Sequence, residues 1–288
     1  MTNSDLQGFK KVLEVAALDD QKTVLIGLLN KAWCDPGGMF DTFLESFDLG
    51  EGISYLLKHM VIVAVDSFAY EKCIHAGKVH CFQFRFKPGV NFSAEQVSMA
   101  PDYLKLVNLK TYLLALVLQY DFNFIFTDID IVWFRPPFRH FSKHADFESA
   151  CEVFNNNSSD IANLQNTGFL HVVASNRTRR LFDLWLQMHR FHPGLHDQDV
   201  FYELKKTQQF KDLDLSFNFM PTVYFGGFCT VSSDLEKVCT NHATCCVGLT
   251  KKLAGQKQVL EDWKLFKSMT PYESRLQGVG FKRPSNCH

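Results

Sequence analysis

Asp128 and Asp130 stand between two apolar runs of the chain, residues 122–126 before them and residues 131–134 after them. In extended backbone, residues i and i+2 point to the same side, so the two carboxylates would converge. Carboxylates that close repel each other and need a cation, and charges held between hydrophobic runs must be compensated. Oxygen ligands suit Mg²⁺ or Mn²⁺, which also bridge to substrate phosphates. The pattern predicts a metal–phosphate site, and the alternative is an acidic pair in a solvated loop.

Two classes of enzyme use an Asp-x-Asp pattern after an apolar strand. In phosphatases of the haloacid dehalogenase type, the first aspartate is a nucleophile and the second an acid/base group, on a strand near the N-terminus. In nucleotide-sugar glycosyltransferases, the pair holds a metal on the donor diphosphate, after a nucleotide-binding half of the chain. The mid-chain position of Asp128 favours a transferase, and the phosphatase remains the alternative.

His242 lies in the spacing Cys239-x-x-His242-x-x-Cys245, which could hold zinc. In an oxidising compartment these cysteines would form disulfides instead. Asp197 and Asp199 have two interpretations as well. They belong to a functional Asp-Gln-Asp motif, or they cap and charge the first turn of a helix.

Asn30 and Asp66 end the first two apolar runs of the chain. In open α/β sheets, ligands bind beyond the carboxyl ends of the strands. Both side chains are therefore candidates to contact the uridine or ribose of a nucleotide.

Such a site needs a sheet whose strands end there. Apolar runs predict strands at residues 23–29, 60–65, 79–84 and 122–126, with helices between them at residues 40–49, 68–75 and 101–118. Continuous apolar strands separated by helices indicate a mostly parallel sheet covered on both faces. The second half is more mixed, with strands predicted at 169–174, 213–219 and 223–225 and helices at 177–190, 197–207 and 260–266. Because no linker or repeat interrupts the chain, we expect a single α/β domain over residues 1–288.

The composition excludes several classes of protein. The chain has 288 residues, enough for a sizeable core, and its 28 phenylalanines make that core Phe-rich. A net charge of −1 argues against a nucleic-acid partner held by a basic field. No apolar run approaches the roughly 20 residues that cross a bilayer. Residues 1–20 do not resemble a signal peptide, so we expect neither a leader nor a membrane span in this chain.

The nine cysteines are clustered along the chain. Cys73 and Cys81 are eight residues apart, and four more crowd into residues 229–246. Such clustering predicts at least two disulfides, Cys73–Cys81 and one within residues 229–246, and an oxidising compartment. Possible N-glycosylation acceptors favour the same compartment; they are Asn91, Asn156, Asn157 and Asn176.

Several motifs together resemble the plant nucleotide-diphospho-sugar transferase family. They are TDIDIVWFR at 127–135 with PF at 137–138, QNTGF at 165–169, SNRT at 175–178, HDQDVF at 196–201, YFGGFC at 224–229 and VCTNHA at 238–243. They occur in the order in which the family has them. The resemblance covers residues 23–263.

The resemblance implies a GT-A type fold, a Rossmann-like and mostly parallel sheet with helices on both faces. It divides the domain into a nucleotide-binding half, about residues 20–135, and an acceptor- and sugar-binding half, about residues 136–270. It further implies a UDP-sugar donor, Mn²⁺ or Mg²⁺ as cofactor, and retention of the anomeric configuration. The sugar would be xylose, arabinose or galactose, and the acceptor a polysaccharide or glycoprotein in the Golgi lumen. Family members usually carry an N-terminal membrane anchor, so the full-length protein would be a single-pass type II membrane protein whose anchor this chain lacks.

The resemblance also implies roles for individual residues. Asp128, Asp130 and His242 would hold the metal; Asp197, Gln198 and Asp199 would act on the donor sugar; Asn30, Asp66, Lys110, Asn166 and Lys251 would bind the donor. Lys251, in Gly248-x-x-Lys251, would neutralise the departing diphosphate. Lys110 stands where family members usually have arginine, so a point charge replaces a bidentate fork. We expect attack by the acceptor on the leaving-group face, because no residue is a clear nucleophile. A catalytically inactive homologue that only binds glycan or nucleotide is a further alternative.

Overall fold

The computed structural model describes residues 2–18, 22–86, 101–285 and 287. Within them, a seven-stranded sheet has the order β3-β2-β1-β4-β7-β6-β8. Its strands are β1 (Thr23–Leu29), β2 (Met60–Ala64), β3 (His80–Gln83), β4 (Asn123–Thr127), β6 (Phe147–Val153), β7 (Leu164–Val172) and β8 (Phe217–Met220). The first four are parallel, and β7 alone runs antiparallel to its neighbours β4 and β6. The expected mostly parallel sheet is confirmed.

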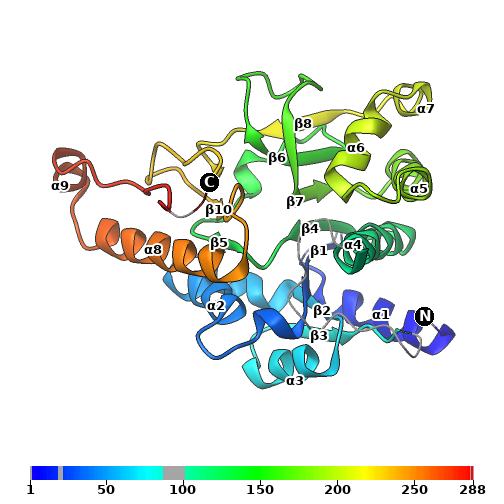
Figure 1. The fold of residues 1–288 in the computed structure, drawn as a ribbon, viewed down its shortest axis with the longest axis horizontal. Coiled ribbons are helices and arrows are strands. Elements are labelled where there is room, and N and C mark those ends of the chain that lie inside the picture. The colour runs from blue at the N-terminus through cyan, green and yellow to red at the C-terminus, as the bar shows by residue number, and fades with distance from the viewer. Residues whose placement is uncertain (1, 19–21, 87–100, 286, 288) are drawn as a thin grey trace.

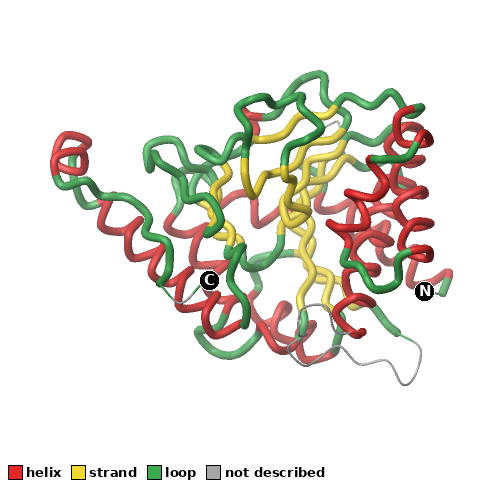
Figure 2. Tube along the Cα trace, turned by 45° about the horizontal axis from the view of Figure 1, so that its top comes forward, coloured by secondary structure: helices red, strands yellow, loops and turns green. Residues whose placement is uncertain are grey.

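Helices cover both faces of this sheet (Figures 1 and 2). One face packs against α1 (Asn3–Ala16), α4 (Pro101–Gln119), α5 (Asn176–Phe191), α6 (Asp197–Lys205) and α7 (Gln208–Lys211). The other packs against α2 (Met39–Leu49) and α3 (Ser67–Ala76). In β4, Phe124 and Phe126 join the first core and Ile125 the second, because alternate side chains of a strand point to opposite faces.

A smaller sheet of three strands lies beside α2 and α8 (Leu249–Lys267) in the described structure. Its order is β5 (Ile131–Trp133), β10 (Thr240–His242) and β9 (Phe225–Gly227). β5 continues the chain directly from β4, and β10 pairs with it antiparallel. A last helix, α9 (Pro271–Leu276), lies at the far end of α8 from the main sheet (Figure 1).

The predicted elements of the first half are confirmed within one or two residues, and those of the second half shift. The predicted strand 213–219 is β8 at 217–220, and the predicted helix 260–266 is the last part of α8. Residues 166–168 lie inside β7, and Asn166 pairs with Ala150 of β6. Among the described helices and strands, the sequence pattern missed six: α1, β5, β6, α7, β10 and α9.

Three disulfides join cysteines of the described chain. Cys73–Cys81 and Cys229–Cys245 confirm the two predicted bridges, and Cys246–Cys287 is a third that the clustering did not predict. The possible glycosylation acceptor Asn91 lies outside the described residues. None of the helices in the described ranges is both long and apolar enough to cross a membrane.

Candidate functional site

Asp128 and Asp130 lie where β4 gives way to β5. The Asp128 N–H donates to the carbonyl of Gly168 in β7 at 2.8 Å, and the Ile131 N–H donates back to the Asp128 carbonyl at 3.2 Å. The Asp130 carbonyl accepts from the Ala243 N–H at 3.1 Å and from the side-chain amide of Gln256 at 2.6 Å. The acidic turn is therefore fixed from β7, from the end of β10 and from α8.

His242 joins the two aspartates because β10 pairs with β5. In that ladder His242 stands opposite Ile131, the residue after Asp130. Its Nε2 lies 3.1 Å from Asp130 Oδ1 and 3.9 Å from Asp128 Oδ2. The three residues can place one ligand atom each within 4.8 Å of one another, and we call them the acidic triad.

The zinc interpretation of His242 is wrong on the same geometry. The sulfur of Cys245 is bonded to Cys229, so it cannot ligate a metal. Cys239 is buried, and its Sγ points to backbone carbonyls, one of them that of Pro136 at 3.8 Å.

Lys252, rather than the predicted Lys251, reaches the acidic triad. Lys252 Nζ lies 2.7 Å from Asp130 Oδ2, whereas Lys251 is exposed at the start of α8. Successive residues of a helix point about 100° apart, so only one of the two lysines can face the triad. The adjacency of the two lysines in the sequence gave no signal of which one.

The surroundings of the two carboxylates push their pKa values apart. Burial raises the pKa of Asp128 to about 6, against the opposing effect of Lys110. Burial would also raise the pKa of Asp130, but Lys252 and His242 outweigh it and hold that pKa below its usual range. Two carboxylate oxygens and an imidazole nitrogen converge here, a donor set that fits Mn²⁺ or Mg²⁺.

Because Gly168 has no side chain, the Asp128 carboxylate and the His242 ring can pack directly against β7. A Cβ at this position would lie 2.4 Å from His242 Cε1, 2.5 Å from Asp128 Oδ2 and 2.9 Å from Asn166 Oδ1. No real side chain fits at such distances, so β7 must carry glycine where it passes the triad. Asn166 Oδ1 in turn accepts the Gly168 N–H at 2.9 Å.

Lys110 and Asp197 form a buried ion pair next to the triad. Thr167 Oγ1 donates to Asp197 Oδ2 at 2.7 Å, and Lys110 Nζ lies 3.4 Å from Thr167 Oγ1 and from its carbonyl. Burial alone would raise the pKa of Asp197, but Lys110 outweighs it and lowers that pKa. Lys110 thus neutralises Asp197, a partner that the sequence did not predict.

Of the Asp-Gln-Asp motif, two residues contact Thr167 and the third lies beside His196. Gln198 Oε1 accepts from the Thr167 N–H at 3.3 Å, while Asp199 is exposed, with Oδ2 3.2 Å from the ring of the N-cap residue His196. The His196 ring lies between the two carboxylates, because its Nδ1 is 3.8 Å from Asp197 Oδ1. A role of Asp199 on the donor sugar stays a prediction.

A cavity of about 400 Å³ opens beside the triad, within the size range of small-molecule sites. Asn30 at the end of β1, Lys110, Asp128, Asp130 and Lys252 contribute to its wall.

Asp66 does not line this cavity, although its neighbour Val65 does, and its contact with a nucleotide stays a prediction. One of its carboxylate oxygens caps α3 through the Ala69 N–H at 2.8 Å, and the other accepts the Lys31 N–H at 2.7 Å. Both oxygens therefore serve the local fold.

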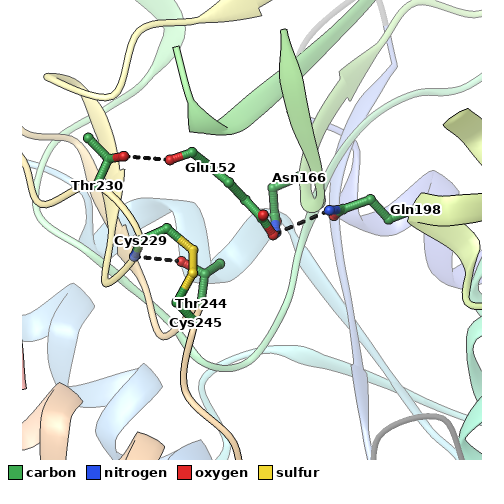
Figure 3. Close-up of a disulfide and its surroundings, with 7 residues drawn as sticks. All are labelled: Glu152, Asn166, Gln198, Cys229, Thr230, Thr244 and Cys245. Atoms are coloured by element: carbon green, nitrogen blue, oxygen red, sulfur yellow. Dashed lines mark hydrogen bonds between the residues drawn. A yellow bond between two sulfur atoms is a disulfide. The ribbon is translucent and has the colours of Figure 1, made fainter. Parts of the chain in front are cut away.

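Glu152 of β6, which the sequence analysis missed, does not line this cavity but contacts two residues of the site. Its Oε1 accepts from the side-chain amides of Asn166 and Gln198, each at 3.2 Å (Figure 3). The only sequence signal was an acidic residue in a short stretch of mixed polarity, residues 147–153.

Comparisons with known proteins agree with this geometry. A family model described as nucleotide-diphospho-sugar transferase matches residues 55–255. Two Arabidopsis thaliana proteins are similar over nearly the whole chain. The uncharacterized protein At4g15970 is 39% identical over 98% of this chain and 74% of its own length. The uncharacterized protein At1g28695 is 35% identical over 93% of this chain and 81% of its own length.

Two solved structures are similar as well. A glycosyltransferase involved in the glycosylation of the major capsid of PBCV-1 has 10% identity and a TM-score of 0.49, over 82% of this chain and 98% of that one. The apo-form glycosyltransferase GlyE of Streptococcus pneumoniae TIGR4 has 11% identity and a TM-score of 0.47, over 91% of this chain and 65% of that one.

Proposed function

Because the chain belongs to the nucleotide-diphospho-sugar transferase family, we propose that it is a glycosyltransferase that moves a sugar from a UDP-sugar to a hydroxyl of a polysaccharide or glycoprotein. The reaction depends on Mn²⁺ or Mg²⁺ and retains the anomeric configuration. The single observation that carries the metal dependence is the convergence of Asp128, Asp130 and His242 at the edge of a cavity.

Different residues around the triad bind different parts of the donor. The cavity beside β1, with Asn30 in its wall, takes the nucleoside. Lys252, whose Nζ lies 2.7 Å from Asp130 Oδ2, adds a positive charge where the diphosphate arrives. A divalent ion held by the triad would neutralise the charge that develops on the departing diphosphate. Family membership favours this reaction over a phosphatase that uses Asp128 as nucleophile.

The proposal extends to the transferred sugar and to the compartment. The family resemblance favours xylose, arabinose or galactose as the transferred sugar. Three disulfides favour an oxidising compartment, and we place the protein in the Golgi lumen.

His242→Ala tests the metal assignment. We expect the variant to fold and to bind UDP without metal as the wild type does, but to lose most of the gain in UDP affinity that Mn²⁺ brings. It should also lose Mn²⁺-dependent hydrolysis of the UDP-sugar that serves as donor. His80→Ala is the matched control, because that ring contacts a backbone carbonyl at the edge of β3.

Isothermal titration of UDP with and without Mn²⁺ measures the difference, and a panel of UDP-sugars identifies the donor. Equal Mn²⁺ dependence in His242→Ala and wild type would reject the triad as the metal site. Phosphatase turnover that Asp128→Asn abolishes would instead support the alternative reaction.

A further inference from the structure

Glu152 lies in a β-bulge of β6. In the β6–β7 ladder, Cys151 pairs with Gln165 and Val153 pairs with Leu164, so Glu152 is an extra residue without a partner. Such a bulge redirects a side chain out of the regular alternation. Thr230 Oγ1 donates to the Glu152 carbonyl at 2.6 Å (Figure 3).

A disulfide stabilises the segment that holds this carbonyl. Cys229, the neighbour of Thr230, is bonded to Cys245, and the Cys229 N–H donates to Thr244 Oγ1 at 3.3 Å (Figure 3). The backbone of Glu152 is therefore anchored to a covalently closed loop.

Only one of the two oxygens of the Glu152 carboxylate accepts hydrogen bonds from the described residues. Oε1 accepts both amide hydrogen bonds, from Asn166 and from Gln198, while Oε2 accepts none from the part of the chain that the structure describes. No lysine, arginine or histidine of the described residues forms an ion pair with it, although the side chain is half-buried. Oε2 is not one of the buried unpartnered atoms of the described chain, so it is open to solvent and can accept a hydrogen bond from a ligand.

Asn166 places this carboxylate next to the acidic triad. Asn166 Oδ1 and Asp128 Oδ2 both lie within 3 Å of the point where a Cβ of Gly168 would stand, at 2.9 and 2.5 Å. The oxygen end of the Asn166 amide thus faces the triad, and its nitrogen end donates to Glu152. The side-chain amide of Asn166 therefore lies between Glu152 and the acidic triad.

The cavity reaches the triad but does not extend to Glu152. Asp128 and Asp130 contribute to its wall, but Glu152, Asn166 and Gln198 do not. A donor with its nucleoside in the cavity and its diphosphate at the triad would therefore extend its sugar toward Glu152.

We propose that Glu152 contacts the transferred sugar and stabilises the positive charge that develops on its anomeric carbon; this inference rests on the proposed function. In that step the bond between the anomeric carbon and the diphosphate oxygen breaks, and its electron pair leaves with the diphosphate. The acceptor oxygen forms the new bond, and its proton passes to a diphosphate oxygen. Asn166 and Gln198 hold the Glu152 carboxylate in place through Oε1. A fixed negative charge facing the reacting carbon acts only as charge develops, so it should affect kcat more than binding.

Glu152→Gln tests this role, because glutamine keeps an acceptor oxygen for Asn166 and Gln198 and removes only the charge. We expect a loss of about 100-fold or more in kcat for donor hydrolysis and for transfer, since removing one group that stabilises transition-state charge costs that much. KM, the affinity for UDP with Mn²⁺ and the melting temperature should stay close to those of the wild type. Glu152→Asp should restore part of kcat. The matched control is Glu203→Gln, which removes a charge paired with Lys206 on the outside of α6.

Isothermal titration with UDP and Mn²⁺, a melting curve and initial rates on the same preparations separate the outcomes. Wild-type kcat in Glu152→Gln would overturn the role of Glu152 and leave the proposed function intact. An equal loss of UDP affinity and kcat would also overturn it, because the residue would then support the nucleotide or metal site. A wild-type protein that neither binds UDP with Mn²⁺ nor hydrolyses any UDP-sugar would overturn the proposed function and the role of Glu152 together.

Discussion

Lys110 of α4 and Asp197 of α6 form an ion pair in the interior of the protein. Their side chains are 9% and 4% exposed. Burial alone would lower the pKa of Lys110, but Asp197 outweighs it and raises that pKa. Since the folded-state pKa of Asp197 is lowered, the stability that this carboxylate contributes is present above its unfolded pKa of about 3.9 and is lost as pH falls through the folded pKa.

Lys110→Met should destabilise the fold by about 3–5 kcal/mol, because it leaves the buried carboxylate of Asp197 without a cation. The double variant Lys110→Met/Asp197→Leu should recover most of that loss, since an apolar pair of similar volume carries no charge to compensate. Urea denaturation at pH 7 measures both. A single variant as stable as the wild type would show that the pair does not carry its charge in the folded protein.

The acidic triad depends on the pairing of three strands. β4 ends at the acidic turn, β7 runs antiparallel beside it, and β10 brings His242 against β5. Gly168 is where β7 passes the triad, and its missing side chain leaves room for the Asp128 carboxylate and the His242 ring. Packing of the triad against β7 therefore requires glycine at position 168.

Gly168→Ala should displace the side chains of the triad with little effect on the rest of the sheet. Its Cβ would lie 2.4 Å from His242 Cε1, so the ring or the Asp128 carboxylate must move. We expect a folded protein whose UDP affinity no longer responds to Mn²⁺, measured by titration calorimetry and circular dichroism. Gly194→Ala is the control, because nothing lies within 4 Å of the added methyl group there. Unchanged Mn²⁺ dependence in Gly168→Ala would contradict the close packing of the triad.

The three disulfides act at the scale of the whole molecule. Cys246–Cys287 ties the start of α8 to the C-terminal segment, and Cys229–Cys245 closes the loop that holds Glu152 through Thr230. Cys34, Cys151 and Cys239 are buried and unbridged, and burial raises their pKa values to about 12, 12 and 11. High pKa and burial both suppress the thiolate that reacts with alkylating reagents.

Thiol labelling followed by mass spectrometry should therefore show three classes of response. The native protein should label slowly if at all, the unfolded protein should label at three positions, and the unfolded and reduced protein at all nine. Peptide mapping assigns the three positions to Cys34, Cys151 and Cys239. Labelling of Cys73 or Cys229 without reduction would contradict the bridges and the lumenal compartment that they support.

The sequence by itself determined the features that depend on local order. The strand β1, the acidic turn after β4 and the clustered bridge Cys73–Cys81 were predicted because apolar runs, i and i+2 spacing and short loops are visible along the chain. The family motifs added the third member of the triad, His242.

The tertiary structure decided which side chains meet across elements. It selected Lys252 over Lys251 through the rotation of α8, paired Lys110 with Asp197, and placed Asp199 beside His196. It exposed Glu152 through a bulge whose partners lie on β7 and in the loop after β9. These contacts join residues far apart in the chain, and helix rotation and strand register depend on packing against neighbours, so no local pattern encodes them.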